Sequence, residues 1–226
     1  MFGTKRKPEA LIFDLDGTLF QTETLLLPAY HATFAQLRAE GRYTGETPPE
    51  RHILGALGMV LKHIWHEVMP EVDESVHRRA DELLTAYQIE GLARGEGTLY
   101  DGVAGTLKAL RDRGMRLFVA SNGLEPYVKG VIRTQGLEPL FETEGLYSAG
   151  QYQTRSKVDL VKRLLETHGV ADAWMVGDRS SDVEAGHCNG LFTVGCDYAG
   201  FGKSAELDKA DARISRFEQL LDLIES

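Results

Sequence analysis

The sequence predicts a doubly wound α/β fold that is interrupted by an all-helical insertion. From about residue 96 onward, helical stretches alternate with short apolar strands. This alternation is typical of a parallel sheet that helices cover on both faces, the Rossmann-like arrangement. Between the first strand and that region, apolar side chains recur at helical spacing with little strand signal. We therefore expect an α/β core of residues 1–21 and 96–226 and a helical domain of residues 22–95.

Each expected element follows from a short stretch of sequence. The first strand is expected at residues 10–16, a buried apolar run that Gly17 ends. Gly41, Pro48 and Pro70 divide the insertion into separate helices. After the insertion, the expected helices are at about 103–113, 125–135 and 156–169, from near Asp182, and at 217–226, and the expected strands are at 115–121, near Phe141, and at 173–178, 191–196 and 212–215.

Composition excludes several classes of protein. The formal net charge is −9, whereas a sequence-independent nucleic-acid binder needs a basic surface. No window approaches about 18 uninterrupted apolar residues, so no membrane span is expected. The N-terminal segment has no apolar stretch before Pro8, so it is not expected to be a signal peptide. Cys188 and Cys196 suit neither a disulfide framework nor a zinc site, and we expect buried or half-buried reduced thiols in a cytoplasmic protein.

Two carboxylates stand at the end of the first expected strand. Asp14 and Asp16 are two residues apart, so a regular pleat would direct both to one face, although one could turn away where the chain bends. Burying both without a partner is unfavourable, and Mg²⁺, which prefers oxygen ligands, would relieve their repulsion. Gly17 allows a tight turn close to a ligand, and Thr18 offers a hydroxyl. On this stretch alone, the alternative is a turn that caps the next helix.

Three later stretches place polar side chains near the same edge of the sheet. Ser121 and Asn122 end one strand, whereas Gly177-Asp178 ends another and Asp182 follows four residues on. Lys157 lies near the start of a helix, where the helix dipole disfavours a cation, so we expect it to meet an anion. Taken singly, each stretch has an ordinary alternative as a helix cap or a solvated side chain. Together they predict one site, because ligands bind at the carboxyl ends of parallel strands.

In chain order, these motifs resemble the four motifs of the haloacid dehalogenase-like hydrolase superfamily. They are the run from Asp14 to Thr18, then Ser121-Asn122, then Lys157, and then Gly177-Asp178 with Asp182. Their order, strand-end placement and spacing all match, and the resemblance covers essentially the whole chain. The insertion looks like the type-1 helical cap of this superfamily. Residues 100–114 resemble the phosphoglycolate phosphatase-like and β-phosphoglucomutase-like members, except that Asp101 stands where many members have proline.

The resemblance implies a Mg²⁺-dependent phosphatase that hydrolyses a small phosphorylated metabolite through an aspartyl phosphate. Asp14 would be the nucleophile, and Asp16 would act first as general acid and then as general base. The implied site residues are Asp14, Asp16 (through its carbonyl) and Asp178 as Mg²⁺ ligands, Thr18, Ser121, Asn122 and Lys157 as phosphate-binding residues, and Gly17, Gly177 and Asp182 as supporting residues. No nucleic acid or membrane partner is expected, and we expect a monomer or a weak homodimer.

Three other functions use similar residues. A phosphomutase of the β-phosphoglucomutase type shares every motif, but the family's mutases often carry a bulkier β-branched apolar residue where this chain has Thr18. A dehalogenase releases a halide that needs no proton, so Asp16 argues against it. A non-catalytic phospho-receiver module would lack the helical insertion and would not need Asp16. Hydrolysis therefore remains the preferred reaction.

The helical insertion is expected to choose the substrate and to close over the site, with the glycines at 91, 95 and 97 as hinges. Arg51 and His52 could touch an anionic or hydroxylated substrate. They lie beside a stretch whose glycines look like the loop that reaches the core site in related proteins, Gly55 and Gly58. Three further histidines of the insertion are expected to be packing or surface residues rather than ligands: His31, His63 and His66.

Overall fold

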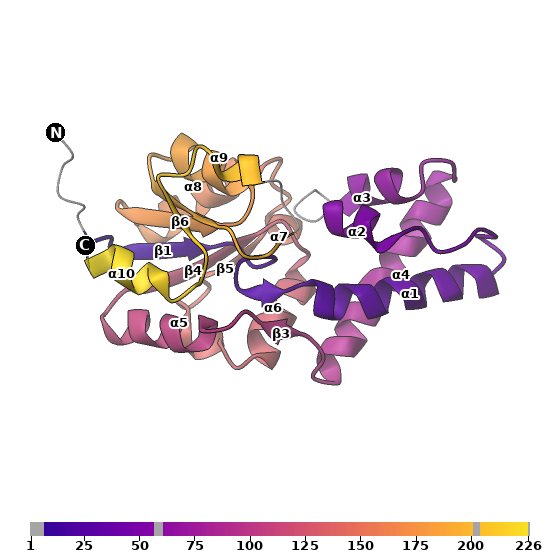
Figure 1. The fold of residues 1–226 in the computed structure, drawn as a ribbon, viewed down its shortest axis with the longest axis horizontal. Coiled ribbons are helices and arrows are strands. Elements are labelled where there is room, and N and C mark those ends of the chain that lie inside the picture. The colour runs from indigo at the N-terminus through magenta and orange to yellow at the C-terminus, as the bar shows by residue number, and fades with distance from the viewer. Residues whose placement is uncertain (1–6, 57–60, 201–203, 226) are drawn as a thin grey trace.

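The fold is a six-stranded parallel sheet with a group of helices beside it (Figure 1). The structure is a computed structural model and describes residues 7–56, 61–200 and 204–225. The strands of this sheet are β1 (Ala10–Phe13), β4 (Arg116–Ser121), β5 (Leu146–Ser148), β6 (Ala173–Gly177), β7 (Phe192–Cys196) and β8 (Ala212–Ile214). They lie in the order β5-β4-β1-β6-β7-β8, and every neighbouring pair is parallel. The predicted α/β fold class is confirmed.

Strand β1 lies at the centre of the sheet because all of its residues are apolar and fully buried. Leu11 and Phe13 belong to one apolar layer, whereas Ala10 and Ile12 belong to the layer on the opposite face. The first layer is covered by α5 (Val103–Asp112), α6 (Glu125–Thr134) and α10 (Gln219–Glu225). The second is covered by α8 (Lys157–His168) and α9 (Ser180–Cys188) (Figure 1). The chain passes from β1 to β4 on one side and later to β6 on the other, so the strand order reverses at β1.

In its described part, the insertion forms four helices with an apolar core of their own. They are α1 (Glu23–Ala39), α2 (Glu50–Gly55), α3 (Leu61–Val68) and α4 (Glu74–Ala93). In that core, the Phe34 ring meets Tyr30 edge-on at 5.0 Å and lies 6.3 Å from Trp65. Figure 1 shows these helices beyond the carboxyl end of β1. That residues 22–95 fold as a separate domain stays a prediction.

A two-stranded antiparallel ladder joins these helices to the sheet. It pairs β2 (Phe20–Gln21) with β3 (Thr98–Leu99) and was not expected from the sequence. Gly97 has a φ of 92°, and a Cβ there would lie 2.4 Å from the Phe20 ring, so only glycine fits. The hinge role of the glycines at 91, 95 and 97 stays a prediction, and Gly91 lies inside α4.

Several expected boundaries were wrong. The strand expected near Phe141 lies at β5, because Pro139 lies within a short 3₁₀ turn, η1 (Glu138–Leu140), and Phe141 enters the core from the end of that turn. Strand β1 ends at Phe13 rather than at residue 16. The helix expected from near Asp182 is present as α9, which begins at Ser180. Two short helical elements were not expected from the sequence: α7 (Ala149–Tyr152) and the 3₁₀ turn η2 (Ser204–Leu207).

The two cysteines differ in exposure, and the described helices show whether any could span a membrane. Cys196 is buried, but Cys188 is exposed, because it lies at the outer end of α9. Within residues 7–56, 61–200 and 204–225, no helix combines the length and the apolarity that crossing a bilayer requires.

Candidate active site

The end of β1 places Asp14 beside a buried lysine. The Lys157 Nζ lies 2.7 Å from an Asp14 carboxylate oxygen and 2.5 Å from an Asp182 carboxylate oxygen. All three side chains are buried. Lys157 is the first residue of α8 and Asp182 lies in the first turn of α9, so the two helices bring their starts to the same strand end. The anion that the sequence predicted for Lys157 is therefore a pair of carboxylates.

Asp14, Asp178 and Asp182 form a buried acidic cluster. One carboxylate oxygen of each lies within 4.8 Å of the others. Burial, and then the neighbouring Asp182, raises the pKa of Asp14 to about 7, and Lys157 opposes this rise. Burial and the neighbouring Asp14 raise the pKa of Asp178 well above its usual range. Since one lysine cannot neutralise three buried carboxylates, the cluster could hold a divalent cation with oxygen ligands.

The two oxygens of Asp182 already have partners. One accepts a hydrogen bond from Lys157, and the other accepts one from the backbone N–H of Arg179 at 3.0 Å. Asp14 and Asp178 are therefore better placed than Asp182 to offer an oxygen to a cation. The ligand set that the sequence resemblance implies, in which Asp182 only supports the site, stays a prediction.

Two glycines allow the acidic side chains to approach the backbone closely. Gly17 has a φ of 75°, and a Cβ there would lie 2.3 Å from a carboxylate oxygen of Asp178. A Cβ on Gly177 would lie 2.3 Å from the carboxyl carbon of Asp182. Both distances are far inside van der Waals contact, so any larger residue would displace an acidic side chain. This explains the supporting role that the sequence assigns to both glycines.

Thr18 does not line the pocket that contains Asp14. Its hydroxyl lies 3.4 Å from a carboxylate oxygen of Asp178, and its carbonyl accepts a hydrogen bond from Tyr198 at 2.7 Å. The structure therefore places the Thr18 hydroxyl next to Asp178. Its contact with a bound phosphate stays a prediction.

Asp16 turns away from Asp14 to different partners. One of its carboxylate oxygens accepts hydrogen bonds from Thr22 at 2.6 Å and from Tyr127 at 2.5 Å. Burial raises the pKa of Asp16, and these two donors lower it in part. Burial, and then the adjacent Asp16, raises the pKa of Tyr127 far above its usual range, so its hydroxyl stays a donor. Sequence reasoning missed Thr22 and Tyr127, since nothing in their spacing marks them as partners of Asp16.

Asp14 and Asp16 line one pocket between the sheet and the helices of the insertion. From the α/β core, Ser121, Asn122 and Lys157 line it together with Asp14 and Asp16. The Ser121 hydroxyl also accepts the backbone N–H of Gly123 at 3.1 Å, in the turn that follows β4. The remaining lining residues are Gly123, Leu124 and Tyr127 from the core side and Thr22, Leu26, Ile53, Ile64, Leu84, Thr85 and Gln88 from the insertion.

Arg51 and His52 do not reach this pocket. Both side chains are exposed and line a separate depression with Gly55, Ala56 and Glu67. On α2, Ile53 lines the pocket instead, and contact of Arg51 or His52 with a substrate stays a prediction. Gly58 and the side chain of His63 lie outside the described residues.

The sequence is similar to one family over most of its length. Residues 8–190 match the family model for haloacid dehalogenase-like hydrolases. Tyrosine-protein kinase PtkA of Mycobacterium tuberculosis (strain ATCC 25618 / H37Rv) is 30% identical over 225 residues, which cover 95% of this chain and 70% of that protein. Pyrophosphatase PpaX of Listeria monocytogenes serotype 4b (strain CLIP80459) is 26% identical over 197 residues, or 85% of each chain.

The fold is also similar to that of solved structures. The crystal structure of a predicted phosphoglycolate phosphatase from Haemophilus somnus 129pt superposes with a TM-score of 0.80 at 22% identity. The superposition covers 97% of this chain and 99% of that chain, so the sheet and the helical insertion both have counterparts there.

Proposed function

Because the chain belongs to the haloacid dehalogenase-like hydrolases, we propose that it is a Mg²⁺-dependent phosphatase that acts on a small phosphorylated substrate through an aspartyl phosphate. One observation carries the proposal: Asp14 and Asp16 line the same pocket but have separate partners. Two carboxylates in different environments can perform different steps, one as nucleophile and one as acid and base. A structural turn would not need both of them to face a pocket.

In the first step, an oxygen of Asp14 attacks phosphorus while the bond from phosphorus to the leaving oxygen breaks. Asp16 gives its proton to that leaving oxygen. In the second step, Asp16 takes a proton from water, which attacks the same phosphorus and releases inorganic phosphate and the Asp14 carboxylate. Lys157, Ser121 and Asn122 hold the phosphoryl oxygens, and Asp182 keeps Lys157 in position.

The buried carboxylates fit Mg²⁺. Asp14 and Asp178 would hold the ion with the backbone carbonyl of Asp16, and Gly17 leaves the space for Asp178 to approach. When bound, Mg²⁺ would neutralise negative charge on the phosphoryl oxygens and on these carboxylates. Pairing Lys157 with Asp182 keeps a second positive charge close to Asp14.

The pocket favours a leaving group without a second negative charge. Among its described lining residues, Lys157 is the one cation, and both Asp14 and Asp182 already neutralise it. The wall that the insertion supplies is largely aliphatic, with Leu26, Ile53, Ile64 and Leu84. PpaX and the phosphoglycolate phosphatase are named for substrates with a second anionic group. An apolar or aromatic leaving group suits this chain better.

Phosphate release from small phosphoesters, with Mg²⁺ and after chelation, tests the proposal directly. We expect hydrolysis of phenyl phosphate with Mg²⁺ and a loss of at least about 100-fold without it, because charge on the transferring group is then poorly neutralised. Pyrophosphate and phosphoglycolate should react more slowly than phenyl phosphate. Full activity after exhaustive chelation would remove the metal from the mechanism. Isomerisation of a sugar phosphate without phosphate release would identify a phosphomutase.

Tyr127 is expected to position Asp16. In Tyr127→Phe, Asp16 loses a hydrogen bond to its carboxylate, an interaction typically worth about 1.5–3 kcal/mol. We expect the first-turnover rate with an alkyl phosphate to fall by about tenfold and that with an aryl phosphate to fall by less than about threefold. Tyr30→Phe is the matched control, since its hydroxyl donates to the Pro48 carbonyl at 2.9 Å, away from the pocket. Equal losses on both substrates would show that Tyr127 acts only through packing.

The helices of the insertion are expected to set specificity. Thr85 lines the pocket on α4, whereas Ala86, the next residue, is exposed and does not. Thr85→Lys should raise kcat/KM for phosphoglycolate relative to phenyl phosphate by about tenfold, because it adds a cation for a second anion. Ala86→Lys adds the same charge to the same helix and should leave the ratio unchanged. Equal ratios in the two variants would contradict a role for this face of α4.

A further inference from the structure

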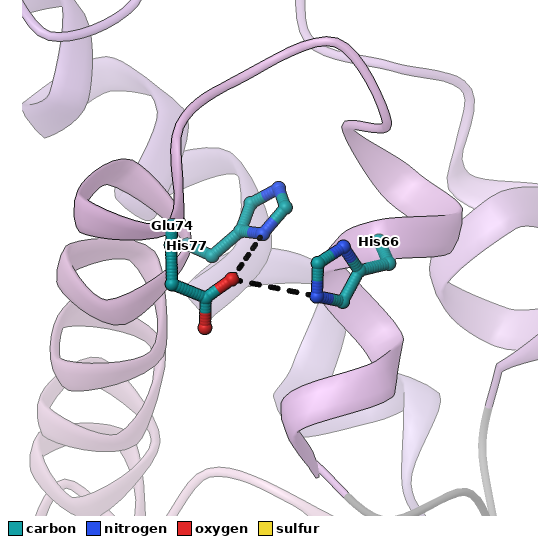
Figure 2. Close-up of side chains that lie close together, drawn as sticks. All are labelled: His66, Glu74 and His77. Atoms are coloured by element: carbon teal, nitrogen blue, oxygen red, sulfur yellow. Dashed lines mark ion pairs between the residues drawn. The ribbon is translucent and has the colours of Figure 1, made fainter.

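Two histidines and a glutamate converge where α3 ends and α4 begins (Figure 2). The His66 Nε2 lies 3.4 Å from a carboxylate oxygen of Glu74, and the His77 Nδ1 lies 3.7 Å from the same oxygen. One nitrogen of each histidine and one carboxylate oxygen of Glu74 lie within 4.8 Å of one another. The His66 and His77 rings meet edge-on with their centroids 4.6 Å apart. None of these residues takes part in the phosphatase chemistry proposed above.

The tautomer of His77 follows from its backbone contact. Its Nε2 lies 2.8 Å from the carbonyl oxygen of Met69, which can only accept a hydrogen bond, so Nε2 carries a proton. In the neutral ring, Nδ1 then has a free lone pair, and this lone pair faces the Glu74 carboxylate. Nδ1 is buried and has no hydrogen-bond partner, and His77 is only 4% exposed. A buried acceptor that faces an anion calls for a cation between them.

A proton on the Nδ1 of His77 would satisfy this arrangement less well than a metal ion. The distance of 3.7 Å to the carboxylate is too long for a hydrogen bond. A doubly protonated His77 would therefore place a positive charge in a buried position with only one hydrogen bond, to Met69. An ion between the three side chains removes this difficulty, because it can contact both lone pairs at once.

The donor atoms are those of a transition-metal site. Two imidazole nitrogens and one carboxylate oxygen suit Zn²⁺ and related ions, whereas Mg²⁺ and Ca²⁺ prefer oxygen alone. Ligand atoms at tetrahedral zinc are about 3.3–3.6 Å apart when each bond is about 2.0–2.2 Å. The two nitrogen–oxygen distances to Glu74, 3.4 and 3.7 Å, are close to this spacing. The Met69 carbonyl completes the usual pattern, in which a metal-bound histidine donates its other N–H to the backbone.

We propose that His66, Glu74 and His77 form a binding site for a divalent transition metal of the zinc type. Between His66 and His77, the chain carries four acidic residues and no basic residue, which raises the local concentration of cations. The bound ion would link α3 to α4, because it would have ligands on both helices. Both helices line the catalytic pocket, α3 through Ile64 and α4 through Leu84, so the ion would fix one wall of it. The sequence had led us to expect His66 only as a packing or surface residue.

Zinc titration of the full chain by calorimetry, in excess Mg²⁺, tests the site. Under the proposed function Mg²⁺ would occupy the carboxylate cluster, and we expect one further equivalent of Zn²⁺ to bind. Since loss of an outer-shell partner typically costs about 10–100-fold in metal affinity, we expect His66→Gln and Glu74→Gln each to weaken binding at least as much. Both side chains are exposed, so these variants should fold. His31→Gln is the matched control, since His31 and Glu50 form another exposed pair, at 2.7 Å.

Nitrogen NMR of the imidazole rings supplies a second measurement that does not depend on activity. We expect His77 to show the neutral tautomer with its proton on Nε2, and its Nδ1 resonance to move on addition of Zn²⁺. Failure of the chain to bind Zn²⁺ in excess Mg²⁺ would overturn the proposal. Unchanged zinc affinity in both His66→Gln and Glu74→Gln would overturn it too, as would an equal loss of affinity in His31→Gln. A doubly protonated His77 whose resonances do not move on addition of Zn²⁺ would also overturn it.

Discussion

Asp14→Asn is expected to reduce turnover by about 10⁴-fold or more while the protein stays folded. The amide has nearly the same shape as the carboxylate but cannot become an aspartyl phosphate, so the first step has no nucleophile. Folding should tolerate the change, because Asp14 lies in a cluster of mutually repelling carboxylates and Lys157 keeps its contact with Asp182. The measurement is kcat on phenyl phosphate beside a melting curve.

Asp197→Asn is the matched control for this variant. Asp197 also follows a strand, β7, but it is exposed and does not line the pocket. Its substitution should leave kcat within about twofold of wild type, because surface changes away from a site have small effects. A near-normal kcat in Asp14→Asn would refute the nucleophile role.

The second large effect is expected from Asp16→Asn, and it should depend on the leaving group. General acid or base catalysis is typically worth about 10²–10⁴-fold, and we expect a loss of this size on alkyl phosphates, whose alkoxides leave poorly without a proton. The nitrophenolate of p-nitrophenyl phosphate needs little protonation, so phosphoenzyme formation should suffer much less. The missing base then slows hydrolysis of the phosphoenzyme. Rapid-mixing assays should therefore show a burst of nitrophenol followed by slow turnover.

Equal losses of the first-turnover rate on alkyl and aryl phosphates would show that Asp16 only shapes the metal site. The double variant Asp16→Asn with Tyr127→Phe refines this test, because Tyr127 donates directly to Asp16. If Tyr127 acts through Asp16, its removal should cause little further loss once Asp16 has been replaced. Additive losses would instead mean that Tyr127 contacts the substrate independently.

The fold and the centre of the candidate site were predictable because both follow from local pattern. Short apolar runs between helical stretches required a parallel sheet, and parallel strands end at one edge. Polar residues at three strand ends therefore had to lie close together. The unusual position of Lys157 at a helix start correctly indicated an anionic partner.

The remaining features depend on contacts between segments that are far apart in the sequence. Asp14 and Asp16 diverge because β1 ends at Phe13, a boundary that an apolar run of residues does not define. Tyr127 reaches Asp16 from α6, 111 residues further along the chain. The aliphatic pocket wall needs four helices to pack, and the tautomer of His77 needs the carbonyl of Met69. Spacing alone contains none of this information.

The ladder between β2 and β3 brings the two ends of the insertion together. Phe20 and Leu99 are directly paired, and Gln21 is paired with Thr98, so the chain leaves the core and returns to it at neighbouring positions. The conformational entropy lost in closing a loop depends only weakly on its length when its ends already meet. Segments of very different size could therefore be spliced in at this point, by recombination or by protein engineering, with little change to the sheet. In this architecture, the sheet edge that carries Asp14 and Asp16 and the pocket wall that the insertion supplies can evolve as exchangeable parts.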